Sequence, residues 1–192
     1  MPKRNQNSRG YSPRKVNTRE VRQRFLIVCE GKETEPNYFR SFRVNRDVVE
    51  IDIKPGSGWQ PSQLIKIAEN ENLKGDYDQV WCVFDRDNWT ANDFKNAIIS
   101  ANNNDFKVAY SNEAFELWYV LHFEFLNAGI NRKDYVKKLN GALSKQYLKN
   151  SETIYDELLD KQDITIKNAI KLLSQYQSPI PAINNPSTAL LG

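Results

Sequence analysis

Acidic side chains follow two apolar segments of the sequence, and these carboxylates are the residues best suited to chemistry. Glu30 comes directly after the apolar run 25–29, and Asp85 and Asp87 come directly after the run 79–84. Short runs that are apolar throughout are typical of strands buried on both faces of a parallel sheet. Carboxylates that converge repel one another unless a divalent cation neutralises them. The pattern predicts a divalent metal site built from Glu30, Asp85 and Asp87.

The order of the strands decides whether the two acidic clusters meet. In an open parallel sheet, ligands bind beyond the carboxyl ends of the strands, at the point where the strand order reverses. For the order 2-1-3-4, that point lies between the first and third strands, which are the strands that carry the acids. Gly31 allows the backbone to turn tightly behind Glu30, and Lys32 is a candidate phosphate contact. A simpler role stays open as well, because Asp87 would also suit the cap of a following helix.

Segments of strand character alternate with segments of helical periodicity in the first two thirds of the chain. This alternation is typical of βαβ units and predicts an α/β fold, with a doubly wound, mainly parallel four-stranded sheet over residues 23–126. Later helical periodicity near 132–139, 151–159 and 163–176, with no further strand, predicts a helical C-terminal extension over residues 127–192. The expected strands lie near 24–29, 48–53, 79–84 and 106–110, and the helices between and after them near 35–42, 62–73, 92–102 and 113–125.

The N-terminal segment has a different composition from the rest of the chain. Residues 1–22 are rich in Asn, Ser, Gly, Pro and Arg without apolar periodicity, which predicts a disordered basic arm. Residues 1–24 hold eight Lys or Arg and one acid, a net charge of +7, whereas the whole chain has +3, so the remainder carries −4. A basic arm on a mildly acidic body indicates contact with nucleic acid. A solubilising tail, or a tail bound to acidic patches of a partner, remains the alternative.

Several classes of chemistry are disfavoured by the composition. Cys29 and Cys82 lie inside apolar runs, and His122 lies in an apolar helical stretch, so we expect all three to be packed residues rather than ligands or catalysts. The chain has no Walker-type Gly-Lys-Ser/Thr motif, which argues against ATP hydrolysis. Nothing resembles a signal peptide, and the run 25–29 is too short to span a bilayer. We therefore expect a cytoplasmic protein without membrane contact.

The acidic motifs resemble those of a known family. An apolar strand followed by Glu-Gly, with a later strand ending in Asp-x-Asp, resembles the Toprim domain of topoisomerases, primases and OLD-family nucleases. The chain more closely resembles the RloB family, whose members are Toprim-type proteins found beside restriction systems, one of them paired with an ATPase in an abortive phage-resistance system. The resemblance rests on four blocks in order, at residues 25–39, 83–87, 111–118 and 185–188.

This resemblance implies roles for the acidic residues. Glu30 would be a general acid or base, and Asp85 and Asp87 would hold Mg²⁺, or Mn²⁺, against the scissile phosphate. Glu113 and Glu116 are three residues apart, so on a helix they would share one face and could complete a second metal position. They could equally form a surface face of that helix. Further contacts to phosphate or nucleic acid would come from Lys32, Arg86, Asn112 and Asn185.

The function implied by the resemblance is a Toprim-type, Mg²⁺-dependent nuclease that cleaves DNA or RNA in anti-phage defence by abortive infection. The alternative is a non-catalytic nucleic-acid-binding, sensor or adaptor subunit of a defence system that contains an ATPase. A topoisomerase or primase is disfavoured, because 192 residues are too few for a strand gate or a polymerase body. The oligomeric state is open, since the aromatic helix at 115–125 would suit an interface as well as a core.

Overall fold

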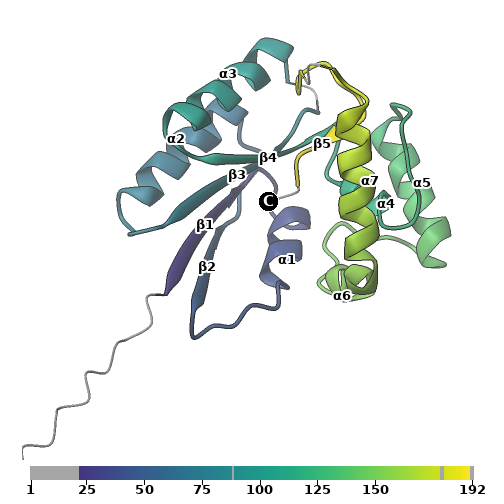
Figure 1. The fold of residues 1–192 in the computed structure, drawn as a ribbon, viewed down its shortest axis with the longest axis horizontal. Helices are drawn as coiled ribbons and strands as arrows, with labels where there is room; N and C mark the ends of the chain where they lie inside the picture. The colour runs from purple at the N-terminus through teal and green to yellow at the C-terminus, as the bar shows by residue number, and fades with distance from the viewer. Residues whose placement is uncertain (1–21, 88, 178–179, 191–192) are drawn as a thin grey trace, which may run out of the picture.

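A single mixed sheet forms the centre of the molecule (Figure 1). The computed structural model describes residues 22–87, 89–177 and 180–190. Within these ranges the strand order is β2-β1-β3-β4-β5, in which the first four strands are parallel and β5 is antiparallel to β4. The strands are β1 (Gln23–Cys29), β2 (Val49–Lys54), β3 (Gln79–Asp85), β4 (Lys107–Asn112) and β5 (Ser187–Thr188).

The expected order of the four parallel strands is confirmed, and β1 and β3 are neighbours near the middle of the sheet. Side chains of β1 alternate between two hydrophobic clusters on opposite faces. Leu26 and Val28 belong to one cluster, whereas Ile27 and Cys29 belong to the other. Because both faces of β1 are covered, every position from 26 to 29 is buried, which explains the unbroken apolar run in the sequence.

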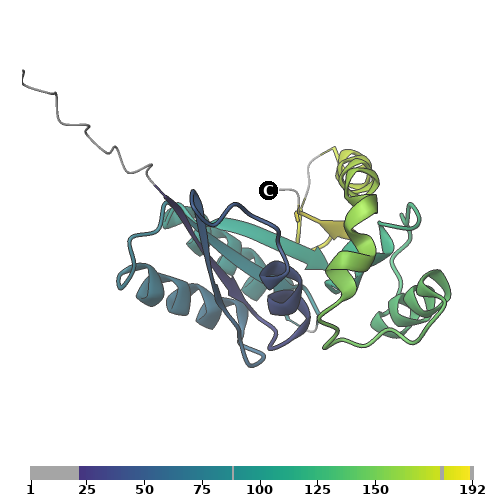
Figure 2. The same cartoon turned by 90° about the horizontal axis from the view of Figure 1, so that it is seen from below.

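Helices α2 (Pro61–Asn72) and α3 (Ala91–Asn103) cover one face of the sheet (Figure 2). Thr90 caps α3, and its hydroxyl accepts a hydrogen bond from the backbone N–H of Asp93 at 3.1 Å. Leu64, Ile65 and Phe94 are fully buried against the strands. This layer is apolar, as the helical periodicity predicts.

The opposite face is covered by α1, α4 and the helices that follow. The aromatic residues Phe115, Trp118 and Tyr119 lie in the core of this layer rather than on an outer surface. The helix here spans residues 116–120, with Phe115 as its N-cap, which is much less than the expected 113–125. The elements of this layer are α1 (Thr34–Arg40), α4 (Glu116–Val120), α5 (Arg132–Leu143), α6 (Ile154–Leu158), the short 3₁₀ helix η1 (Leu159–Lys161) and α7 (Gln162–Ser174).

The expectation of no strand after residue 126 is wrong, because the chain returns to the sheet as β5. Ser187 pairs with Asn112 and Thr188 with Ser111. The Thr188 hydroxyl donates to the Tyr110 carbonyl at 3.0 Å. A strand of two polar residues has no periodicity of its own, so only its partner strand reveals it.

The two cysteines and the histidine are packed residues, as expected. Cys29 and Cys82 are buried free thiols, and burial raises the pKa of Cys82 to about 12. His122 is 1% exposed, and burial lowers its pKa to about 4. Its Nδ1 donates to the Trp118 carbonyl at 2.9 Å, since a carbonyl oxygen can only accept. None of the three is placed for reaction at neutral pH.

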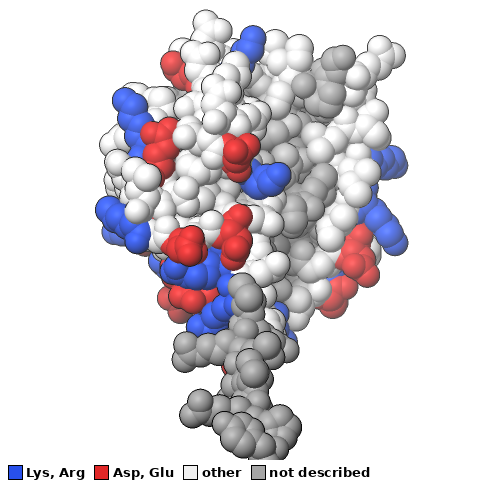
Figure 3. Space-filling view, turned by 60° about the vertical axis from the view of Figure 1, so that its left-hand side comes forward, with Lys and Arg blue, Asp and Glu red and all other residues white. Residues whose placement is uncertain are grey.

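No helix in the part of the chain that the structure describes is both long enough and apolar enough to cross a membrane. The arm expected at residues 1–22 lies, except for Arg22, outside the described residues. Arg22 pairs with Glu50, and Arg24 pairs with Glu50 and Asp52. Acidic and basic side chains accordingly stand side by side where the chain enters the sheet (Figure 3).

Candidate carboxylate centre

The carboxyl ends of β1 and β3 bring the two predicted acidic clusters together. The Glu30 N–H donates to the Val83 carbonyl at 2.9 Å, which continues the pairing of the strands by one residue. At the end of β3, the Asp85 N–H donates to Oε2 of Glu30 at 3.0 Å. The contact expected between the ends of the first and third strands is therefore present.

Glu30 is held by two N–H donors from the β3 side. In addition to the Asp85 N–H, the indole N–H of Trp89 donates to Oε1 at 3.3 Å. Burial raises the pKa of Glu30, and the negative charge of Asp87 raises it further, while both hydrogen bonds lower it. The donors fix the orientation of the carboxylate without neutralising its charge.

Asp85 and Asp87 are joined by a cation that the sequence did not suggest. Oδ2 of Asp85 accepts from the Phe115 N–H at 3.1 Å and from Nη2 of Arg132 at 3.2 Å. Nη1 of the same guanidinium lies 3.4 Å from Oδ2 of Asp87. Arg132 is the first residue of α5, after the N-cap Asn131. The guanidinium therefore bridges the two aspartates of the Asp-x-Asp motif.

Glu35 is a buried member of the same site, with 6% of its surface exposed. It lies in the first turn of α1, where an acidic side chain is favourable because of the positive end of the helix dipole. A Cβ atom on Gly31 would come within 2.2 Å of Oε2 of Glu35. Gly31 thus leaves room for the Glu35 carboxyl, and the chain bends at residues 30–33, as expected behind Glu30.

Glu116 is the most deeply buried acid of the site, at 2% exposure. Its Oε1 lies 3.3 Å from Nζ of Lys149, although this contact does not have hydrogen-bond geometry. Glu113 does not share a helix face with Glu116, because α4 begins only at Glu116. Instead Glu113 is partly exposed, and its backbone carbonyl accepts from the Asp87 N–H at 3.1 Å.

The carboxylates act on each other electrostatically. Burial, with Glu30 and Glu116 adding to it, raises the pKa of Glu35 to about 7. Burial and the charges of Glu35, Glu116 and Glu30 raise the pKa of Asp85 well above its usual range. Arg132 opposes both shifts. Without a further cation, the centre therefore favours bound protons over full ionisation.

On this side of the sheet, several buried polar atoms lack a hydrogen-bond partner. Among the described residues they are Oε1 of Glu116, Nε2 of His122, Nε of Arg132 and the hydroxyls of Tyr135 and Tyr147. Burial and the nearby charge of Glu113, followed by that of Asp85, raise the pKa of Tyr135. Burial and then Glu116 and Glu35 raise the pKa of Tyr147. Both hydroxyls thus stand close to the acids, and unsatisfied groups of this kind are expected where water or an ion binds.

The predicted phosphate-binding residues have different surroundings. Lys32 is exposed beside the centre. Nε of Arg86 donates to the Ala182 carbonyl at 3.1 Å, and the Asn112 amide donates to the Pro181 carbonyl at 3.1 Å. Asn185 is exposed and packs beside Gly129. Arg86 and Asn112 hold the C-terminal segment against the end of the sheet, so Lys32 and Asn185 are the members of this group that are exposed.

A separate apolar groove of about 560 Å³ lies on the α1 side of the sheet. Phe25, Ile51, Trp81 and Trp118 are among the residues that line it, together with Ile166 of α7. None of the acids described above lines it. The groove therefore plays no part in the chemistry of the carboxylate centre.

The donor set of the centre suits a hard divalent cation. It consists of carboxylate oxygens, one of which is buried without a hydrogen bond, and Mg²⁺ and Mn²⁺ prefer such ligands. As arranged, however, no group of three acidic, histidine or cysteine side chains in the described ranges could hold a metal ion. Arg132 stands between Asp85 and Asp87 instead. The residue types fit a metal, while their present spacing serves a guanidinium.

Fold and site together define an α/β protein whose mostly parallel sheet carries a buried carboxylate centre at the carboxyl ends of β1 and β3. The chain belongs to the RloB-like protein family, whose model matches residues 25–191. No curated protein matches the chain, and no solved structure matches it. The resemblance to this family that the sequence motifs indicate is confirmed over nearly the whole chain.

Proposed function

We propose that this RloB-like protein is a nuclease that hydrolyses phosphodiester bonds of DNA or RNA with Mg²⁺ or Mn²⁺ as its cofactor. The observation that carries the proposal is the surplus of buried and half-buried carboxylates. Glu30, Glu35, Asp85 and Glu116 share one site with the single guanidinium of Arg132 and the ammonium of Lys149. Buried charge is costly unless it is paired or coordinates a metal, so this excess of negative charge supports a divalent cation.

Glu30, Asp85 and Asp87 would hold the cation, as the resemblance to Toprim domains implies. When bound, a divalent cation polarises a phosphoryl oxygen and lowers the pKa of a bound water. Glu30 is oriented by the Asp85 and Trp89 N–H groups, so its oxygens have fixed positions from which to hold or pass on a proton. Lys32 would contact the phosphate backbone beside the centre.

The wider role that we propose rests on family membership and on the charge of the N-terminal segment. We expect a Toprim-like domain with a helical C-terminal extension, acting in the cytoplasm in anti-phage defence by abortive infection. The net charge of +7 on residues 1–24 supports contact with nucleic acid. An ATPase is the expected protein partner, and a membrane is not expected to be involved.

A second candidate function is a nucleic-acid-binding or sensor subunit that leaves catalysis to a partner. One observation favours it: the guanidinium of Arg132 already neutralises part of the charge of Asp85 and Asp87. In such a protein, the carboxylate centre would be a structural remnant, and Asp85→Asn would change neither nucleic-acid binding nor phenotype.

A cleavage assay separates the two candidates. Purified protein would be incubated with Mn²⁺ or Mg²⁺ and labelled single-stranded DNA, duplex DNA, tRNA or other RNA. The nuclease proposal predicts cleavage that chelation abolishes and that Asp85→Asn lowers at least about 100-fold, since even residues that only orient a metal ligand contribute about 10- to 100-fold. Asp105→Asn is the matched control, because Asp105 is exposed and its positive φ of 58° suits asparagine.

Each outcome of the assay supports or contradicts one of the two candidate functions. Metal-dependent cleavage that survives in Asp105→Asn but not in Asp85→Asn supports the nuclease. Cleavage of equal rate in both variants contradicts the assigned centre. Nucleic-acid binding without cleavage, unchanged in Asp85→Asn, supports the sensor subunit.

A further inference from the structure

We infer that Arg132 is a built-in counter-cation for the Asp-x-Asp motif that a divalent metal displaces, and that the displaced guanidinium then binds a phosphate of the nucleic acid. The inference rests on the proposed function and adds to it both a residue and a coupling. It follows from three features of Arg132: its contacts, its attachment to the fold and its exposure.

The contacts place the guanidinium between the two aspartates. Nη2 lies 3.2 Å from Asp85 and Nη1 lies 3.4 Å from Asp87, so each side of the fork serves one carboxylate. A cation held by both aspartates would need the same space between them. Metal and guanidinium therefore compete for one position, and charge makes the competition unequal, since the metal carries +2 and the guanidinium +1.

The attachment of Arg132 allows its side chain to leave while its backbone stays. Arg132 begins α5, where the side chain of Asn131 accepts from the Asp134 N–H at 3.1 Å. Tyr135 and Leu139 of the same helix are fully buried and anchor it in the core. Because the backbone is fixed at the start of a capped helix, displacement requires only a change of rotamer.

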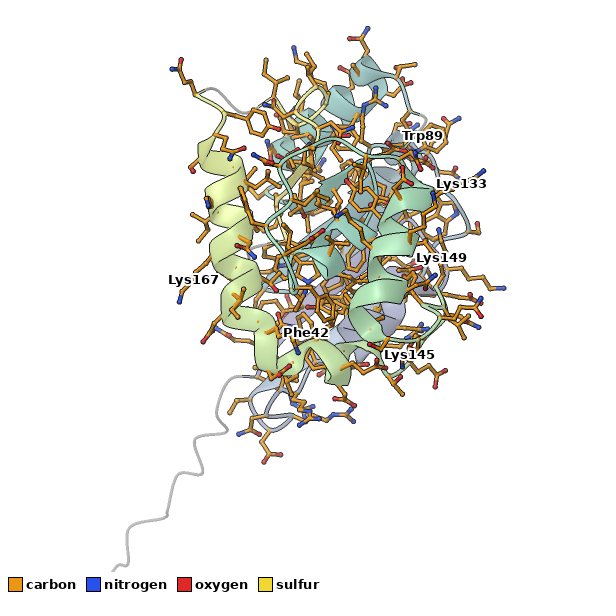
Figure 4. The ribbon with its side chains drawn as sticks, turned by 90° about the vertical axis from the view of Figure 1, so that its right-hand side faces the viewer. Phe42, Trp89, Lys133, Lys145, Lys149 and Lys167 are labelled. Carbon is orange, nitrogen blue, oxygen red and sulfur yellow. The ribbon has the colours of Figure 1, made fainter. Side chains whose placement is uncertain are left out.

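The exposure of Arg132 gives the displaced group a way out. Its side chain is 35% exposed, whereas that of Asp85 is 10% exposed, so Arg132 is the partner of this pair that reaches solvent. Its Nε is buried without a partner, so part of its donor capacity is unused. Trp89, Lys133 and Lys149 lie along the same side of the molecule, beside α5 (Figure 4). A displaced guanidinium would thus enter a cationic and aromatic border of the centre.

The fork of an arginine suits a phosphate as well as it suits carboxylates. Its N–H donors bind planar oxyanions bidentately, and its charge is permanent. When a metal takes over Asp85 and Asp87, Arg132 loses both of its anionic partners. A phosphate arriving at the metal supplies a new partner, so metal and nucleic acid should bind cooperatively through this residue.

The test is a calorimetric titration of Mn²⁺ into the full chain as wild type, Arg132→Gln and Lys167→Gln. Lys167 is the control, because it lies on α7, away from α5 (Figure 4), is exposed and has no ion pair with any residue that the structure describes. Removing the competitor should tighten Mn²⁺ binding about tenfold in Arg132→Gln, which corresponds to about 1.4 kcal/mol. Lys167→Gln should change it less than about twofold, because an exposed charge is screened.

In a second measurement, the affinity for an oligonucleotide should fall in Arg132→Gln, whereas the affinity for Mn²⁺ should rise. With Mn²⁺ saturating, binding of a short fluorescent single-stranded oligonucleotide should weaken about tenfold or more in Arg132→Gln, as expected for loss of a charge-assisted hydrogen-bonded contact. Should Arg132→Gln fail to fold, Arg132→Lys replaces it. Lysine keeps the charge but cannot bridge both aspartates with a planar fork, so Mn²⁺ binding should tighten by a smaller factor.

The outcomes distinguish this inference from the proposed function. Tighter Mn²⁺ binding together with weaker oligonucleotide binding supports the displacement. Equal Mn²⁺ affinity in wild type and Arg132→Gln overturns the displacement and leaves the metal site standing. Absence of Mn²⁺ binding in every variant overturns both the displacement and the metal-dependent nuclease.

Discussion

The two layers of helices that cover the sheet bury different kinds of side chain. The α2–α3 layer is filled with apolar side chains such as Leu64, Ile65 and Phe94. The layer of α1, α4 and α5 encloses the acids Glu35 and Glu116. In the described ranges, every buried side-chain nitrogen or oxygen atom without a hydrogen-bond partner belongs to this second layer, in or after α4.

This difference indicates that the first layer stabilises the fold and that the second layer forms the functional site. An apolar layer with satisfied groups contributes stability through burial and close packing. A layer that retains unpaired buried charge and hydroxyls loses stability, and such departures from local consistency are expected at functional sites. Changes in the first layer should therefore reduce stability alone, whereas changes in the second should alter stability and function in opposite directions.

The largest effect is expected from Phe94→Ala in the α2–α3 layer. Phe94 is fully buried, with its ring centroid 5.2 Å from that of Phe84 and 5.8 Å from that of Tyr110. The cavity should lower the free energy of unfolding by about 3–5 kcal/mol. Denaturant titration measures it, with the half-exposed Ile99→Ala of the same helix as control. A loss no larger than that of the control would remove the contrast between the layers.

A smaller effect of opposite sign is expected from Glu35→Gln. The folded-state pKa of Glu35 is raised from 4.5 to about 7. Between these pH values the folded carboxyl keeps a proton that the unfolded chain releases, so metal-free stability falls as pH rises through this window. Above it, Glu35→Gln should raise the free energy of unfolding by about 3 kcal/mol, because a pKa difference of one corresponds to about 1.4 kcal/mol.

Denaturant titrations at several pH values, with a chelator present, measure the change in Glu35→Gln. Glu33→Gln is the control, since Glu33 is exposed two residues away. The gain in stability should be absent at pH values below the window and should come with weaker Mn²⁺ binding. A variant that is destabilised above the window would show instead that the buried carboxylate is a stabilising group, and the contrast between the two layers would then fail.

The smallest effect is expected at the exposed surface of the second layer, from Asp156→Asn in α6. Asp156 pairs with Arg43 at 2.7 Å, but the two side chains are 58% and 66% exposed. Solvent screens such a pair, so the free energy of unfolding should change by less than about 1 kcal/mol. Thermal unfolding at low and high salt measures the contribution. A larger, salt-sensitive loss would mean that the contact between these segments is more than a surface pair.

Much of the fold follows from local signals in the sequence. Unbroken apolar runs identified β1 and β3, and their adjacency followed from the general rule for parallel sheets. The same rule brought Glu30 to Asp85, which are joined by one hydrogen bond of 3.0 Å. Periodicity could not reveal β5, because its two polar residues acquire their conformation by pairing with β4.

The parts of the site that were missed depend on contacts between distant segments. Arg132 lies 47 residues from Asp85 in the chain, and nothing around it distinguishes it from other basic residues at helix starts. Glu35 had an ordinary local role available in the first turn of α1, and only its burial reveals the other one. Gly31 gave a usable signal, since the absence of a side chain beside an acid makes room for a second acid.

The most direct test of the metal-dependent centre is the anomalous diffraction of Mn²⁺ in crystals of the wild-type protein grown with MnCl₂. We expect an anomalous peak at ligand distance, about 2.1 Å, from oxygens of Asp85 and Asp87, with the Arg132 guanidinium turned away. Ordered crystals without such a peak, in which Arg132 still bridges the two aspartates at saturating Mn²⁺, would contradict a metal-dependent centre.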